Sequence, residues 1–158
     1  MKVKIQEYIK NEKYYIVPTR KHKEYIGMNH EPWSNNIRFE IFQDLGESKD
    51  YLTPDINRFF LLNLKEIETL LKTMTLLWNE AKNNRPVHNR TFSIRCYGDY
   101  NIQLTLTKAE NHSEQLILEK INKVKLPTQP FSVRLPYSYS KGMYHVLNNL
   151  IKNKNFGG

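Results

Sequence analysis

The chain has 158 residues, a formal net charge of +8 and a single cysteine, Cys96. This length suffices for one domain with a sizeable core or for two half-sized units that share a core, and we favour the second arrangement. The single cysteine excludes an intramolecular disulfide framework. No run of residues is long and apolar enough to span a bilayer, and no apolar segment follows the basic N-terminus, so we expect a soluble, cytoplasmic protein.

The positive charge is concentrated in the second half of the chain. Residues 1–82 carry thirteen Lys or Arg against twelve Asp or Glu, a net charge of +1. Residues 83–158 carry eleven against four, a net charge of +7. A field of this sign favours polyanionic partners.

The first half predicts short strands joined by polar segments. Aromatic and β-branched residues indicate a strand at 14–17, which Pro18 ends, and a basic turn follows at 20–23. Strict alternation predicts a half-buried strand at 37–41. Residues 44–57 predict a hairpin loop or an irregular strand, and 59–62 a last strand that leads directly into a helix.

That helix is predicted over residues 63–81. Asn63 is placed to cap it, and Glu66 completes a capping box. Apolar residues recur at helical spacing along its length, as an amphipathic helix requires. The apolar stripe is wider than one small sheet needs, so we expect this helix to pack on a second helix.

The second half repeats this order of elements after a linker at 83–89. Strands are predicted at 92–97, 102–107, 116–126 and 131–135, the first two joined at Gly98-Asp99. A helix follows at 138–152, capped by Ser138 or Ser140. We therefore predict an α+β protein of two tandem ββββα units, 1–82 and 90–158, with antiparallel sheets and paired amphipathic helices in one pseudo-dimeric domain.

Side chains on a strand alternate between its two faces, so the faces away from the helices should point outward. In the second unit this outward set contains no acidic residue and comprises Thr91, Ser93, Arg95, Tyr97, Gln103, Thr105, Thr107, Ser132 and Arg134. In the first unit it comprises Arg38, Glu40 and Phe42, with Tyr14 or Tyr15 and the turn at 20–23 nearby.

A basic sheet face with interspersed aromatic rings is typical of single-stranded nucleic-acid binding, because cations contact phosphates and rings stack on bases. An ordinary solvated face is the alternative interpretation. The candidate binding residues are Lys13, Tyr15, Arg20, Lys21, Lys23, Arg38, Phe42, Arg95, Tyr97, Gln103, Thr105, Lys120 and Arg134.

Catalytic motifs are not found in the sequence. The five histidines, 22, 30, 88, 112 and 145, show no metal-ligand spacing, and there is no glycine loop that would hold a phosphate. A nuclease site built from His30, Glu31 and Asp99 lacks a supporting pair of carboxylates. We expect no enzyme activity, no metal and no cofactor.

Residues 36–42 (Asn-Ile-Arg-Phe-Glu-Ile-Phe) and 60–71 (Phe-Leu-Leu-Asn-Leu-Lys-Glu-Ile-Glu-Thr-Leu-Leu) resemble the C-terminal domain of the family of transcriptional coactivator positive cofactor 4. The order of strands and helix also resembles the plant Whirly proteins and the PUR repeat. The resemblance implies ββββα units that pair through their helices and bind single-stranded DNA, or RNA, on curved sheets.

Two rival functions stay open at the level of sequence. The first rival is a protein-binding accessory module of replication, recombination or transcription on the same scaffold, which an exposed apolar patch would favour. A small enzyme or a nuclease inhibitor would instead require polar groups that converge in a pocket. The tandem units predict either a pseudo-dimeric monomer or a homo-oligomer.

Overall fold

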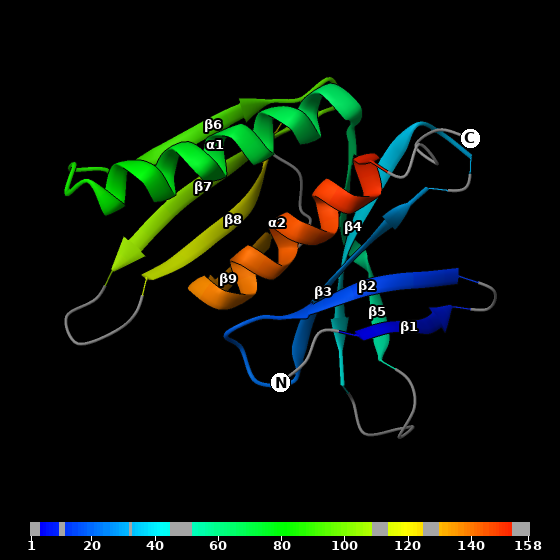
Figure 1. The fold of residues 1–158 in the computed structure, drawn as a ribbon. Coiled ribbons are helices and arrows are strands. Elements are labelled where there is room, and N and C mark those ends of the chain that lie inside the picture. Colours follow the sequence, from blue (N-terminus) through cyan, green and yellow to red (C-terminus); the bar gives the residue numbers. More distant parts are fainter. Residues whose placement is uncertain are drawn as a thin grey trace.

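The computed structural model describes residues 4–9, 12–31, 33–44, 52–108, 114–124 and 130–152. These residues form two antiparallel sheets and two helices, which confirms the predicted α+β class (Figure 1). Sheet 1 contains β1 (Lys4–Ile9), β2 (Glu12–Pro18), β3 (Glu24–His30), β4 (Asn36–Gln43) and β5 (Thr53–Asn63), paired in chain order. Sheet 2 contains β6 (Thr91–Arg95), β7 (Tyr100–Lys108), β8 (Glu114–Asn122) and β9 (Phe131–Pro136), also paired in chain order.

The first unit has five strands where the sequence predicted four. The sequence pattern did not reveal β1 and β3, and β5 begins within the segment predicted as a loop or irregular strand. In β3 the strand signal is interrupted by Gly27, which the packing requires: a Cβ there would lie 2.4 Å from the Phe42 ring. Pro54 is tolerated in β5 because β5 is the outermost strand of sheet 1.

Helix α1 (Leu64–Lys82) begins as predicted. The Asn63 side chain accepts a hydrogen bond from the Glu66 N–H at 2.9 Å, and the Glu66 carboxylate accepts one from the Asn63 N–H at 2.9 Å. Both halves of the capping box are therefore present.

Helix α2 (Tyr137–Lys152) follows β9 with no intervening residue, so the predicted serine cap is wrong. Ser138 and Ser140 both lie inside the first turn of the helix. The Ser140 hydroxyl donates to the Tyr137 carbonyl at 2.7 Å instead of accepting from the helix N-terminus.

The main core is continuous across both sheets and both helices. At its centre the Phe60 ring of β5 stacks on Phe39 of β4 at 4.5 Å and meets Phe131 of β9 edge-on at 4.8 Å. Helix α2 contacts β2 and β3 of sheet 1 as well as β8 and β9 of sheet 2. The two units thus bury their apolar surfaces against each other.

The helices pack on one another, which confirms the predicted pairing. The Trp78 ring of α1 lies edge-on to Tyr144 of α2 at 5.5 Å and to Tyr137 at 6.1 Å. In Figure 1, α1 runs along β6 and β7 of sheet 2, whereas α2 runs from β9 toward sheet 1.

Side chains of sheet 2 bond to the free edge of β5. The Tyr100 hydroxyl accepts from the Leu61 N–H at 2.9 Å and donates to the Leu61 carbonyl, and the Lys120 ammonium donates to the Phe59 carbonyl at 3.1 Å. Burial raises the pKa of Tyr100 and lowers that of Lys120. These bonds fix the outer strand of one sheet against the inner face of the other.

Candidate nucleic-acid interface

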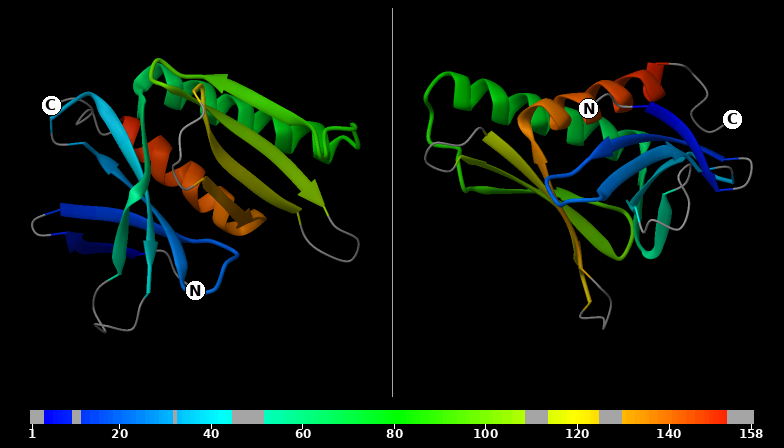
Figure 2. Two further views of the ribbon diagram at one scale, coloured as in Figure 1. Left: turned by 180° about the vertical axis from the view of Figure 1, so that it is seen from behind. Right: turned by 90° about the horizontal axis from the view of Figure 1, so that it is seen from below.

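The face of sheet 2 that points away from the helices is called here the outer face. Seen from behind, β6 and β7 lie in front of α1, so no helix covers this face (Figure 2). Alternation separates the two faces as predicted, with residues such as Ile94, Leu104 and Val133 buried on the helix side. The outer face carries exposed or half-buried side chains, namely Thr91, Ser93, Arg95, Asn101, Gln103, Thr105, Thr107, Gln115, Ile117, Glu119, Ile121, Ser132 and Arg134.

The outer face holds one carboxylate that the predicted set left out. Glu119 of β8 pairs in register with Gln103 of β7 and with Ser132 of β9, which places it at the middle of the face. The prediction that this face has no acidic residue is therefore wrong. A strand was predicted at 116–126, but the alternation of its side chains was not used to decide which of them lie on the outer face.

Cations lie at both edges of the outer face. Arg95 is on β6, the first strand of the sheet, and Arg134 is on β9, the last. Three strand spacings separate these strands, about 14 Å. The central row of the face is Ser93–Gln103–Glu119–Ser132, and Arg95 and Arg134 lie one row away on opposite sides of it. A strand that contacts both arginines would therefore cross the face diagonally.

The basic turn of the first unit adjoins this face at the β9 edge. The Arg20 N–H donates to the Arg134 carbonyl at 2.8 Å, and the Arg20 guanidinium donates to the Gln115 side chain at 3.1 Å. Lys21 and Lys23 are exposed on the same turn, Lys21 with its ammonium 3.8 Å from the Glu24 carboxylate. We call Arg20, Lys21, Lys23 and Arg134 the basic corner.

Tyr97 lies in the turn between β6 and β7, just past Arg95. Its side chain is 96% exposed, whereas its neighbour Cys96 is buried. The Tyr97 N–H donates to the Glu66 carboxylate at 2.6 Å, and the Lys123 ammonium donates to the Cys96 carbonyl at 2.8 Å. The turn is therefore fixed by α1 on one side and by the segment after β8 on the other.

Cys96 itself is not placed for nucleophilic chemistry. Burial, followed by the charge of Glu66, raises the pKa of its thiol from 9.0 to about 11. The thiol therefore stays protonated at neutral pH, whereas reactive cysteines have a lowered pKa.

The structure removes three predicted residues from any outward surface. Phe42 and Tyr14 are buried in a second cluster on the far face of sheet 1, and Tyr15 packs on the main core. Both faces of sheet 1 are thus covered in this region, and the prediction of an outward face is wrong there. Lys120 lies on the inner face of sheet 2, in register with buried Phe131, and bonds to β5 as described above.

Arg38 is held by neighbours within sheet 1. Its guanidinium lies 2.7 Å from the Glu40 carboxylate, 3.8 Å from that of Glu31, and 4.0 Å from the centre of the Phe59 ring. These contacts already neutralise its charge. The side chain of Lys13 lies outside the described residues, although its backbone forms part of β2.

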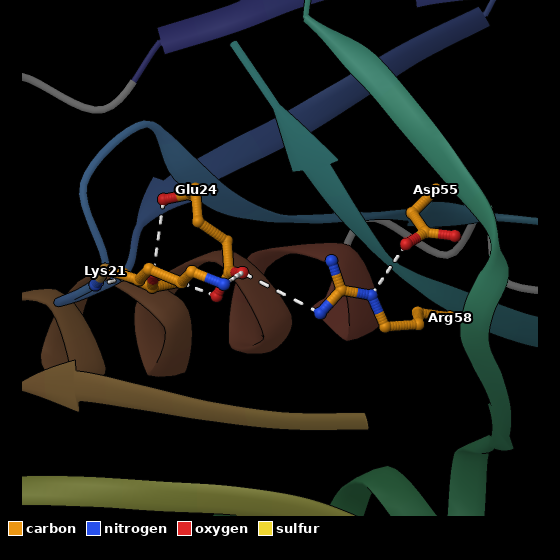
Figure 3. Close-up of polar contacts among 5 residues, drawn as sticks. Lys21, Glu24, Asp55 and Arg58 are labelled. Carbon is orange, nitrogen blue, oxygen red and sulfur yellow. Dashed lines mark hydrogen bonds and ion pairs between the residues drawn. The ribbon is translucent and has the colours of Figure 1, made fainter. Parts of the chain in front are cut away.

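A second polar cluster lies at one end of sheet 1, on its core-facing side. Glu24 and Arg58 point toward one another, with 3.8 Å between carboxylate and guanidinium, and the Arg58 guanidinium also contacts the Asp55 carboxylate at 2.7 Å (Figure 3). The Thr19 hydroxyl lies 3.3 Å from the Glu24 carboxylate. Each charged group in this cluster has an oppositely charged partner nearby, as buried charges require. We therefore interpret the cluster as a structural ion network at the end of the core.

Within the described ranges, no three His, Cys, Asp or Glu side chains gather in a group that could hold a metal ion. The helices found there also include none of the length and apolarity that crossing a membrane requires. No protein-family model matches the chain, and no curated protein matches it.

Proposed function

We propose that the protein binds single-stranded nucleic acid on the outer face and the basic corner, and that it does so without catalysing a reaction. The observation that carries the proposal is the uncovered polar face with Arg95 at one edge and the Arg20–Arg134 pair at the other. Cations at the two edges would contact phosphates that are separated along a strand crossing the sheet, with the intervening nucleotides over the polar face.

The exposed ring of Tyr97 favours unpaired bases as the ligand. A base in a single strand is free to stack on such a ring, whereas a base within a duplex is already stacked on both sides. We favour DNA over RNA because the coactivator-like residues 36–42 and 60–71 point to single-stranded DNA. A cytoplasmic location forms part of the proposal and suits the single reduced cysteine.

The direct test is a salt-titrated binding assay with single-stranded DNA, duplex DNA and RNA of equal length. Single-stranded DNA is expected to bind most tightly, with an affinity that falls as salt rises. Absence of binding to all three ligands at low salt would contradict the proposal.

Replacing both arginines tests which face is used. The double variant Arg95→Ala/Arg134→Ala is expected to flatten the salt dependence of single-strand binding by about 0.7 for each phosphate that is no longer neutralised, and to weaken binding roughly tenfold near physiological salt. Its matched control is Lys72→Ala/Lys152→Ala, which removes the same charge from exposed helix positions. If the two double variants bind with equally reduced affinity, only net charge matters and the outer face is not the site.

Replacing the exposed ring tests the preference for unpaired bases. Tyr97→Ala is expected to cost about 1–3 kcal/mol of binding to a single strand and much less to a duplex, because only the single strand loses a stacked base. Tyr97→Phe, which retains the ring, is the control and should bind normally. Equal losses on both ligands would show that Tyr97 acts through the fold.

A protein-binding accessory module is the second candidate function. It is favoured by exposed apolar side chains at the Tyr97 end of sheet 2. Ile121 and Val124 are exposed there, and the Lys123 N–H between them donates to the Asp99 carbonyl of the turn that carries Tyr97. If the protein binds none of the three nucleic acids, a protein partner at this end of the sheet becomes the favoured function.

A further inference from the structure

A cavity of about 460 Å³ lies where the second half of α1 meets the first half of α2. Its lining includes Trp78 and Lys82 of α1, Tyr137, Lys141 and Tyr144 of α2, and Glu114 at the start of β8. The helices lie on the side of sheet 2 opposite to the outer face, so the cavity is separate from the proposed nucleic-acid site. Its volume falls in the range of sites for small molecules.

Aromatic rings from both helices form much of its wall. Trp78 of α1 is edge-on to both Tyr137 and Tyr144 of α2. Such a wall offers ring faces and edges to a planar ligand, for which offset-stacked and edge-on contacts are the favoured geometries.

The charges around the cavity are unbalanced. The Lys141 ammonium lies 4.5 Å from the centre of the Trp78 ring and 5.9 Å from that of Tyr137. In the part of the chain that the structure describes, neither Lys141 nor Lys82 forms an ion pair. Among the described residues of the lining, Glu114 is the one acidic residue, against these two lysines, and its carboxylate lies 2.7 Å from the His88 ring.

The indole N–H of Trp78 does not open into the cavity. Trp78 is only 9% exposed, and its indole nitrogen is itself buried, with no acceptor among the described residues. A ligand in the cavity would therefore contact the ring of Trp78 and not its N–H. The cations beside the aromatic wall that have no ion-pair partner among the described residues are the ammonium groups of Lys82 and Lys141.

We propose that this cavity binds a small aromatic anion, a molecule that joins a planar ring to a carboxylate or phosphate group. The ring would pack on Tyr137 and Tyr144, and the anionic group would be held by Lys82 and Lys141 through charge-assisted hydrogen bonds. Aromatic carboxylates and nucleoside monophosphates share this chemistry.

The two tryptophans of the chain allow the cavity to be observed directly. Trp33, the other tryptophan, is 92% exposed, so Trp33→Phe should leave the fold intact and make Trp78 the only indole. This protein would be titrated separately with adenosine monophosphate, 4-hydroxybenzoate, adenosine and inorganic phosphate. Trp78 fluorescence and the Trp78 indole N–H resonance would be followed in each titration.

At least one of the two aromatic anions is expected to saturate with a Kd below about 1 mM and to shift the indole N–H resonance. Whichever binds more tightly identifies the source of the ligand. Adenosine and inorganic phosphate, each lacking half of the chemistry, should bind at least about tenfold more weakly. Saturation by neither aromatic anion, or equal binding of phosphate alone, would overturn the proposal.

Lysine variants in the Trp33→Phe background locate the site. Lys141→Ala is expected to weaken binding of the aromatic anion about tenfold, because it removes one charge-assisted hydrogen bond. Lys72→Ala, an exposed lysine of α1 outside the cavity, is the matched control. Arg95→Ala/Arg134→Ala should bind the anion normally, which keeps this result independent of the nucleic-acid proposal. Equal affinities of the Lys141 and Lys72 variants would place the ligand elsewhere and overturn the assignment.

Discussion

Phe60→Ala is expected to lower the free energy of unfolding by about 3–5 kcal/mol, as for other large aromatic side chains removed from a packed core. Phe60 is 1% exposed and contacts Phe39 of its own sheet and Phe131 of the other sheet. Removing the Phe60 ring would therefore leave a void where the two sheets meet, and the packed side chains on both sides would keep it from closing. Urea denaturation with a fixed slope measures the loss.

The same experiment tests whether the two units depend on one core. A shared core predicts a single transition in which helix content, followed by circular dichroism, and Trp78 packing, followed by fluorescence, change together. Leu76→Ala, at a half-exposed position on α1, is the control and should change stability by less than about 0.5 kcal/mol. Two separate transitions, or a loss for Phe60→Ala no larger than that of the control, would contradict a common core.

Arg58→Ala is expected to cost about 2–3 kcal/mol of unfolding free energy. Breaking a fully buried ion pair costs roughly 3–5 kcal/mol, because it leaves one charge buried and unpaired. The expected cost here is smaller, since Asp55 is partly exposed and Glu24 keeps the Thr19 hydroxyl and the Lys21 ammonium. Glu24 itself is 5% exposed, so it has little access to water once the guanidinium is gone.

An exposed ion pair provides the comparison for this network. Arg85 lies 3.0 Å from Glu80, but its side chain is 66% exposed, so Arg85→Ala should cost no more than about 1 kcal/mol. Combining Arg58→Met with Glu24→Gln should recover part of the loss, because the buried Glu24 position then carries no charge, while Asp55 keeps its charge at a partly exposed position. If Arg58→Ala is as mild as Arg85→Ala, the cluster contributes little to stability.

The elements that the sequence predicted well are those with one buried face. Helix α1 and the strands of sheet 2 each bury one side, so their apolar residues recur with a clear period. Sheet 1 buries both faces around Phe42 and Tyr14, and a strand buried on both sides loses its alternation. That loss explains why β3 was missed and why Phe42 and Tyr15 were assigned outward positions.

The candidate site was predictable only where it depends on the parity of a single strand. Arg95, Gln103, Thr105 and Arg134 were placed correctly on the outer face by alternation alone. Glu119 and Lys120 could have been placed in the same way, by extending the parity of Leu116 and Leu118 along β8. The hydrogen bond between Arg20 and Arg134 joins residues far apart in the chain and leaves no local signal in the sequence.

The bonds from Tyr100 and Lys120 to β5 also bear on self-association. The outer strand of a sheet presents unpaired N–H and C=O groups that another chain can pair with, and this is a common start of aggregation. On β5 the groups of Leu61 and the carbonyl of Phe59 are occupied by side chains of the same molecule. The second unit thus shields β5 against pairing with a strand of another copy. An isolated first unit would expose these unpaired backbone groups of β5 and would be expected to self-associate.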